Sequence, residues 1–197
     1  MYEKFLIIVD PQNDFIEGGS LPVSGARSAM QQLAEFVKNS SAEFSTIFVT
    51  QDAHPENHCS FTANGGIWPV HCVRNSSGFE VFPQLQEVLS GLNNVEYCRK
   101  GTDSGVEQYS IFAFSDGEIT NPDGKKIISV LAKSSSPQIV VCGIAGDVCV
   151  MNTLNDLVQI RKSAEGISVA ANFTASIDGG EKLNAFCNEN NISIINL

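Results

Sequence analysis

Short apolar runs alternate along the chain with segments of helical periodicity. The runs hold four or five residues and are mostly apolar and β-branched, which is typical of strands buried on both faces. The six predicted strands are Phe5–Val9, Thr46–Thr50, Asn94–Cys98, Gln138–Cys142, Ile167–Ala170 and Ile192–Ile195. The five predicted helices are Ala26–Lys38, Pro83–Leu89, Lys125–Lys133, Val148–Ser163 and Gly180–Glu189.

This alternation predicts an α/β protein with three layers, in which helices cover both faces of a mostly parallel six-stranded sheet. No internal repeat, low-complexity segment or linker divides the sequence. We therefore expect residues 1–197 to form a single domain, which is an ordinary size for one hydrophobic core.

Two long segments do not fit the regular pattern. Residues 51–78 are rich in His, Cys, Asn, Pro and Gly, and residues 100–124 are similarly irregular. Within the second segment, Asn121-Pro122-Asp123-Gly124 is a strong turn signal, which we interpret as a hairpin tip. Long irregular segments inside a compact protein are usually functional.

Chemically capable groups follow directly on several predicted strands. Asp10, Asp52, Lys100 and the segment Gly143–Cys149 each come after one of these strands. Because open parallel sheets bind their ligands beyond the carboxyl ends of the strands, we expect the four groups to lie along one edge.

All three histidines lie in the first irregular segment, at positions 54, 58 and 71. Together with Asp52, which precedes His54 by two residues, they offer one carboxylate and up to three imidazoles. This ligand set suits zinc, iron or manganese. The alternative is that loop histidines are simply solvated. The spacing Asp52-x-His54 favours a metal site, because an extended segment points both side chains to the same face.

Cys149 follows a strand and a run of small residues at the start of a predicted helix. Unpaired amides and the helix dipole at such a position favour a thiolate, so we expect a lowered pKa and a candidate nucleophile. A structural role is the alternative for any cysteine, and it fits Cys142 and Cys187 better. Asp10 ends an apolar strand, where a carboxylate is costly unless it is partnered or working. Lys100 taken alone is an ordinary surface lysine.

The net charge of −10 argues against a nucleic-acid partner, which would require clustered Lys and Arg. The first apolar run, Phe5–Val9, is too short for a signal-peptide core or a membrane span. We therefore expect a cytoplasmic protein that acts on a small molecule without binding a membrane. Apolar residues outside the core are compatible with a homo-oligomer.

The chain resembles the isochorismatase-like cysteine hydrolases, and within them the nicotinamidases, also called pyrazinamidases. The resemblance rests on Ile8–Phe15, Glu17–Leu21, Thr50–His54, His58–Phe61, Trp68–Val73, Lys100–Gly101 and Gly143–Val150. It implies the Rossmann-like fold of that family and hydrolysis of nicotinamide to nicotinate and ammonia through a thioester, as a step of NAD salvage. Pyrazinamide is an implied second substrate.

The resemblance also assigns roles to individual residues. It implies a catalytic triad of Asp10, Lys100 and Cys149, and a cis peptide bond between Ile144 and Ala145 that directs the amides of Ala145 and Cys149 into an oxyanion hole. It implies a divalent metal ion held by Asp52, His54 and His71, with His58 as a further ligand. Zinc is the first expectation for this ion, and iron and manganese are the alternatives. The substrate ring would contact Phe15, Trp68 and Tyr109.

One position departs from the family, in which Thr is usual where this chain has Gly146. Any hydrogen bond from that hydroxyl is lost, which affects the rigidity of the segment before Cys149. Two competing functions are an amidase of ureido or carbamoyl compounds and an inactive metal-binding module on the same fold. The loop histidines disfavour the first, and the complete set of Asp10, Lys100 and Cys149 disfavours the second.

Overall fold

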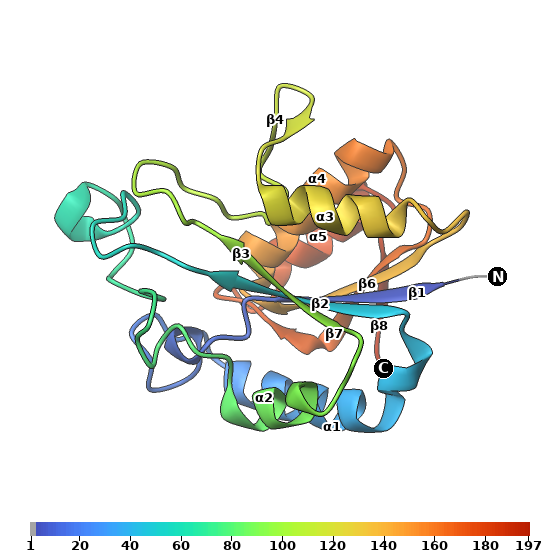
Figure 1. Ribbon diagram of the computed structural model, residues 1–197, viewed down its shortest axis with the longest axis horizontal. Coiled ribbons are helices and arrows are strands. Elements are labelled where there is room, and N and C mark those ends of the chain that lie inside the picture. The colour runs from blue at the N-terminus through green and yellow to red at the C-terminus, as the bar shows by residue number, and fades with distance from the viewer. Residues whose placement is uncertain (1–2) are drawn as a thin grey trace.

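The computed structural model describes residues 3–197 and contains one central sheet with helices on both faces (Figure 1). The strands are β1 (Lys4–Val9), β2 (Thr46–Asp52), β3 (Val95–Lys100), β6 (Gln138–Ile144), β7 (Ile167–Ala175) and β8 (Ser193–Ile195). Their order across the sheet is β3-β2-β1-β6-β7-β8, and every neighbouring pair is parallel. The predicted three-layer α/β fold with a six-stranded sheet is confirmed.

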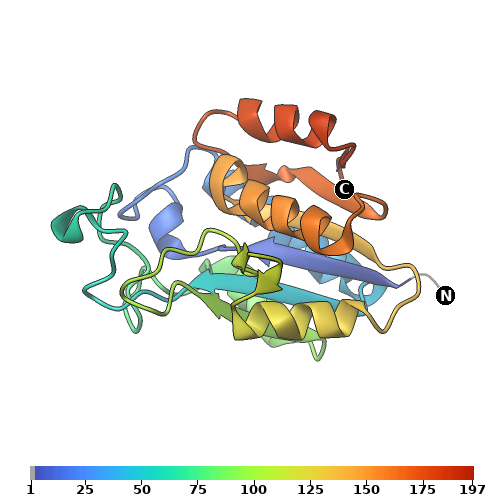
Figure 2. The ribbon, with the colours of Figure 1, turned by 90° about the horizontal axis from the view of Figure 1, so that it is seen from above.

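Helices α1 (Ala26–Ser40) and α2 (Pro83–Ser90) cover one face of the sheet. Helices α3 (Pro122–Leu131), α4 (Met151–Arg161) and α5 (Glu181–Glu189) lie across the other face, as the view from above shows (Figure 2). Strand β1 serves both layers. Leu6 and Ile8 pack with α1, whereas Phe5, Ile7 and Val9 pack with the opposite helices. This burial on two sides explains why the strand sequence is apolar at consecutive positions.

Short helical turns and one hairpin complete the fold. The 3-10 turns are η1 (Asn13–Phe15), η2 (Ser41–Glu43) and η3 (Thr62–Asn64), and the π-helical turn η4 (Gly146–Val150) leads directly into α4. Strands β4 (Phe114–Ser115) and β5 (Glu118–Ile119) form a two-stranded antiparallel hairpin. The long loops gather at the carboxyl ends of β1, β2 and β3, on the left of Figure 1.

The prediction of a hairpin tip at residues 121–124 is wrong. Asn121 is the N-cap of α3, where its side chain accepts hydrogen bonds from the amides of Asp123 and Gly124, and Pro122 is the first helical residue. Asn at the N-cap and Pro at the following position are a helix-start signal as well as a turn signal. The hairpin instead turns at Asp116-Gly117, where both residues have positive φ, as a type I′ turn requires.

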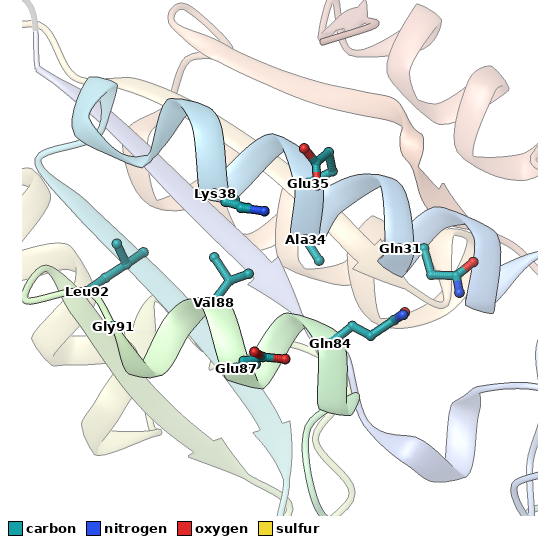
Figure 3. Close-up of a pocket in the computed structure, with 9 residues that line it drawn as sticks. All are labelled: Gln31, Ala34, Glu35, Lys38, Gln84, Glu87, Val88, Gly91 and Leu92. Atoms are coloured by element: carbon teal, nitrogen blue, oxygen red, sulfur yellow. The ribbon is translucent and has the colours of Figure 1, made fainter.

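A shallow groove runs between α1 and α2 on the surface (Figure 3). Its lining residues are Gln31, Ala34, Glu35, Lys38, Gln84, Glu87, Val88, Gly91 and Leu92. None of these described residues offers a thiol or an imidazole, and the groove lies away from the strand ends that carry the charged groups. Among residues 3–197, no helix is long and apolar enough to cross a membrane.

Candidate active site

Four strand ends bring the candidate catalytic groups together at one edge of the sheet. Asp10 follows β1, Asp52 ends β2, Lys100 ends β3, and Cys149 lies in η4 immediately after β6. The register between β2 and β3 sets Asp52 directly beside Lys100. The convergence predicted from the order of strands and polar residues is therefore present in the structure.

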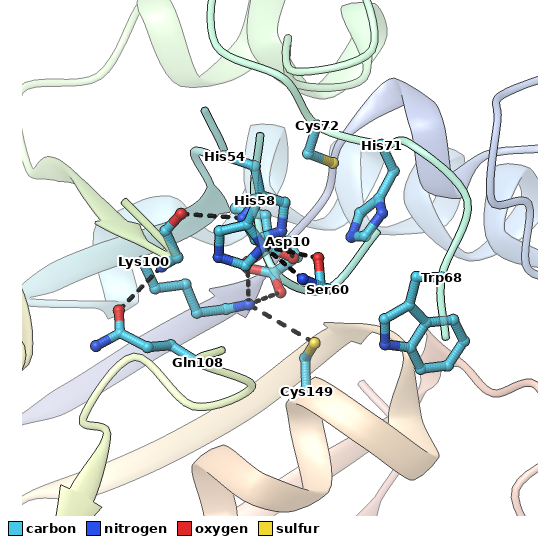
Figure 4. Close-up of polar contacts among 12 residues, drawn as sticks. Asp10, His54, His58, Ser60, Trp68, His71, Cys72, Lys100, Gln108 and Cys149 are labelled. Carbon is cyan, nitrogen blue, oxygen red and sulfur yellow. Dashed lines mark hydrogen bonds and ion pairs between the residues drawn. The ribbon is translucent and has the colours of Figure 1, made fainter. Parts of the chain in front are cut away.

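The ammonium group of Lys100 is the centre of a buried charge cluster (Figure 4). Its Nζ lies 2.8 Å from Oδ2 of Asp10, 2.6 Å from Oδ1 of Asp52 and 3.7 Å from Sγ of Cys149. The side chains of Lys100 and Asp10 are 0% exposed. The hydroxyl of Thr50 donates to the other oxygen of Asp10 at 2.6 Å, which fixes the orientation of that carboxyl group.

Burial and charge act against each other in this cluster. Burial raises the pKa of Asp10, although the neighbouring ammonium group opposes that effect. Burial alone would lower the pKa of Lys100, but the charges of Asp10 and Asp52 raise it well above its usual value. Lys100 is therefore protonated at neutral pH and lies between two acidic side chains.

The expectation of a lowered pKa for Cys149 is wrong. The thiol is buried, and burial raises its pKa well above the usual value even though Lys100 acts in the opposite direction. The helix start is a weak source of stabilisation compared with removal of the thiolate from water. Cys149 therefore rests as a thiol, and it needs a base to become a nucleophile. The carboxyl group of Asp10 lies within 4.8 Å of the sulfur.

The turn before Cys149 is held by its own backbone. The Ala145 carbonyl accepts hydrogen bonds from the amides of Val148 and Val150, and the peptide bond between Ile144 and Ala145 is cis. The space that a side chain at Gly146 would need is filled, because a Cβ there would lie 2.1 Å from Oγ of Ser176. The serine hydroxyl from the segment after β7 thus packs where the usual family residue would project.

Two histidines and one aspartate face a common point beside this cluster. Ligand atoms of Asp52, His54 and His71 all lie within 4.8 Å of one another. His54 contacts the Gly101 carbonyl through Nδ1 at 2.9 Å, and His71 contacts the Pro69 carbonyl in the same way at 2.8 Å. Because a carbonyl only accepts, each Nδ1 carries a proton, which leaves Nε2 as the nitrogen through which each ring could bind a metal.

His54 is held especially closely. Gly101 has a φ of +61°, and a Cβ at that position would lie 2.4 Å from Cε1 of the imidazole, so only glycine allows this approach. Burial lowers the pKa of His54 to about 3, which keeps the ring neutral. Among the residues that the structure describes, Nε2 of His54 is buried without a hydrogen-bond partner. An orphaned imidazole nitrogen aimed at a carboxylate and a second imidazole is what a cation site requires.

The structure does not bring a free nitrogen of His58 to this point. Nε2 of His58 lies 3.2 Å from the Val106 carbonyl, and Nδ1 accepts from the amide and the hydroxyl of Ser60. The ring stacks on His54 with centroids 3.9 Å apart. Both ring nitrogens of His58 therefore have polar partners, with Nε2 donating to the carbonyl and Nδ1 accepting from Ser60, although a ligand atom of His58 also lies within 4.8 Å of ligand atoms of His54 and Glu107.

A pocket opens directly above Cys149. Its lining includes the three residues expected to contact a substrate ring, Phe15, Trp68 and Tyr109, together with Asp52, His71 and Ala145. The indole Nε1 of Trp68 donates to the hydroxyl of Tyr109 at 3.2 Å, which joins two loops across the pocket. One wall of the pocket is aromatic and the floor carries the thiol, so a flat ring with a reactive substituent fits the chemistry of its surface.

Comparison with known proteins gives the family. Residues 4–160 match the model of the isochorismatase domain. The chain belongs to the isochorismatase family. It is 34% identical over 159 residues to the nicotinamidase/pyrazinamidase of Mycobacterium tuberculosis, which covers 79% of each chain. It is 31% identical over 167 residues to the nicotinamidase of Acinetobacter baylyi, which covers 77% of this chain and 72% of that one. Like these relatives, it is an amidohydrolase.

Solved structures of family members have the same architecture. The pyrazinamidase of Pyrococcus horikoshii, crystallised in complex with zinc, is 28% identical with a TM-score of 0.81 and covers 99% of both chains. PnC1 from L. infantum, crystallised in complex with nicotinate, is 29% identical with a TM-score of 0.82 and covers 98% of this chain and 92% of that one.

Several site residues of this family member were not found from the sequence. Gln12 uses its side chain to hold Asp52 from both sides, because it accepts from the Asp52 amide and donates to the Asp52 carbonyl. Glu107, Val148 and Ile177 line the pocket. Gln12 could have been suspected because it lies in the motif that begins at Asp10, whereas Ile177 carried no local signal.

Proposed function

We propose that this enzyme converts nicotinamide and water into nicotinate and ammonia, and that it accepts pyrazinamide in the same pocket. The observation that carries the proposal is the thiol of Cys149 beside Lys100 and Asp10 at the floor of a pocket walled by aromatic residues. The names of the relatives support it. Returning nicotinate to NAD synthesis would be the role of this reaction in the cell.

Asp52, His54 and His71 would hold a divalent cation. The two free Nε2 atoms and the orphaned position of His54 fit such an ion, and the donor set of one carboxylate and two imidazoles suits zinc before iron or manganese. When bound, the cation would supply a Lewis-acid anchor for the pyridine nitrogen and so fix the direction in which the carboxamide points. Three protein ligands would leave positions open for solvent and substrate.

Asp10 is the base of the proposed reaction. A carboxyl group with a raised pKa is a stronger base than an ordinary aspartate, and it lies close to the sulfur whose proton must leave. In the first step, the thiol proton of Cys149 moves to Asp10 while the sulfur attacks the carboxamide carbon. Lys100 stabilises the negative charge that develops on sulfur and oxygen nearby.

The amides of Ala145 and Cys149 would receive the oxyanion, because both belong to the turn that carries the nucleophile. Collapse of the tetrahedral species breaks the carbon–nitrogen bond, and Asp10 returns its proton to the departing nitrogen so that ammonia leaves. A water molecule then gives a proton to Asp10 and its hydroxide to the thioester carbon. The carbon–sulfur bond breaks, nicotinate is released, and Cys149 recovers its proton.

The purified enzyme should release ammonia and nicotinate in equal amounts when it is supplied with nicotinamide. The comparison substrate is a linear ureido compound, which carries an amide without a ring. The aromatic wall formed by Phe15 and Trp68 predicts a large preference for the ring compound. Turnover of the ureido compound alone would contradict the proposed function and favour the competing amidase.

Metal binding is tested with a matched pair of variants, His71→Ala and His58→Ala. His71 offers a free Nε2, so its loss should remove most of the bound zinc per chain, as measured by elemental analysis after dialysis. His58 has both nitrogens engaged, so His58→Ala should keep much more zinc. Equal zinc content in the two variants would contradict the assignment of the ligands.

A further inference from the structure

Ile177 is an apolar side chain that stands at the mouth of the pocket without being buried. It is 54% exposed, yet it lines the same pocket as Val148 and Cys149. Single exposed apolar side chains are common on protein surfaces, so the observation that points to a ligand contact is the place of Ile177 in the pocket lining beside Val148 and Cys149. Ile177 is therefore placed to contact the face or edge of a bound ring.

A single side chain connects Ile177 to the segment that carries the nucleophile. Oδ1 of Asp147 accepts a hydrogen bond from the Ile177 amide at 2.9 Å. Asp147 lies in η4, two residues before Cys149, and is only 7% exposed. A buried carboxylate that accepts from a backbone amide is a strong tether.

The chain is anchored on both sides of Ile177. Strand β7 is paired with β6 up to Ala175, which lies opposite Ile144. Beyond Ile177, the carboxylate of Asp178 accepts from the amides of Gly180 and Lys182 and so fixes the start of α5. Both ends of the segment are therefore anchored, and Asp147 sets the position of the residue between them.

We propose that Ile177 contacts the substrate ring and limits which substituted pyridine carboxamides enter, and that Asp147 is the positioning residue that holds Ile177 over Cys149. This inference rests on the proposed function for the class of substrate. It assigns to Asp147 no contact with the reacting atoms. Its side chain acts through the Ile177 amide and so fixes the position of Ile177 relative to Cys149, which lies in the same turn as Asp147.

The test compares Ile177→Ala, Asp147→Ala and Asp147→Asn in the metal-loaded enzyme, with nicotinamide and a series of its ring-methylated forms as substrates. Removing the Ile177 side chain should raise the relative kcat/KM for at least one methylated ring about tenfold, the usual effect of one methyl group in an apolar pocket. It should also raise KM for nicotinamide with little change in kcat. Asp147→Ala should reproduce the same change in selectivity.

Asp147→Asn keeps an oxygen that can accept from the Ile177 amide, so its selectivity should stay close to that of the unaltered enzyme. The matched control is Ile194→Ala, a partly exposed isoleucine on the edge strand β8, which should change neither KM nor selectivity. Melting temperatures of all variants separate a general loss of stability from a change in the pocket. Asp147→Ala with unaltered selectivity would overturn the inference.

Binding gives a second reading that does not depend on turnover. Trp68 is the chain's single tryptophan and lines the pocket, so its fluorescence reports occupancy by the same ring compounds. Ile177→Ala and Asp147→Ala should shift the ratio of the dissociation constants for methylated and unmethylated rings in the same direction. If the unaltered enzyme releases no ammonia, the proposed function fails, and the binding ratios still decide whether Asp147 and Ile177 act together.

Discussion

Replacing Lys100 by Met removes the one positive charge that stabilises two buried carboxylates. Met has nearly the same length and fills the same space, so the change isolates charge from packing. In the unaltered protein the ammonium group lies 2.8 Å from Asp10 and 2.6 Å from Asp52, and all three side chains are at most 6% exposed. Without Lys100, the two acidic groups face each other with no compensating cation among their described neighbours.

The distances give the scale of the effect. At an effective dielectric constant of about 20, each of these ion pairs is worth about 6 kcal/mol of Coulomb energy. Burial of the three ions offsets several kcal/mol for each of them. Removing one partner from a buried pair typically costs about 3–5 kcal/mol, because the remaining charge stays unpaired. We expect Lys100→Met to lower the free energy of unfolding by that amount.

The assay is urea unfolding at neutral pH in the presence of a chelator, so that no cation bound to Asp52 compensates for the lost lysine. Adding Asp10→Asn to Lys100→Met should recover about 1–2 kcal/mol, because one of the two repelling charges disappears. Lys100 opposes the rise that burial causes in the pKa of Asp10, so without it that folded-state pKa should rise further and the lost stability of the single variant should return as the pH falls. A loss below about 1 kcal/mol would refute the account of this cluster.

Two further predictions concern the packing and the charge of the fold. Gly146→Ala should lower the unfolding free energy by about 1–3 kcal/mol and reduce kcat, because its Cβ meets the Ser176 hydroxyl. Ser176→Ala should relieve most of that loss in the double variant, and additive effects in urea unfolding would contradict the contact. The slight burial of Glu17 raises its pKa, but hydrogen bonds outweigh that effect. These bonds, which include those from the Gly25 and Arg27 amides, lower the pKa of Glu17 below 4.5. Glu17→Gln should therefore lower the thermal midpoint at neutral pH, and the difference should vanish as the pH falls through that lowered pKa; a difference that persists in acid would show another cause.

The centre of the sheet could be predicted from the sequence because β1, β2 and β6 are buried on both faces and are therefore apolar at consecutive positions. The edge strands β3 and β8 are more exposed and carry a weaker pattern. Several predicted strands stop before the observed strands do, at the carboxyl edge of the sheet that carries the site. Strand β2 continues to Asp52 and β3 to Lys100, because backbone pairing between them persists where the side chains become charged. Apolar patterning cannot detect such strand ends, since the pairing there depends on the neighbouring strand.

The roles of the site residues were only partly visible in single positions. Lys100 looked like any surface lysine until its strand was placed beside Asp10 and Asp52, since its burial is a property of the assembled sheet. The pKa of Cys149 was predicted in the wrong direction, because a helix start is visible in the sequence whereas removal of the sulfur from water is not. His58 belongs to the same loop as the other histidines, and only its contacts with Ser60 and Val106 separate it from them.

The proposed reaction depends on a thioester between the Cys149 thiol and the substrate acyl group. The most direct measurement adds hydroxylamine to the reaction with nicotinamide and separates nicotinate from the hydroxamate. Hydroxylamine attacks a thioester in place of water, so the hydroxamate fraction should rise with hydroxylamine concentration, and Cys149→Ala should release neither product nor ammonia. Hydroxamate or ammonia formation that persists in Cys149→Ala would contradict the account.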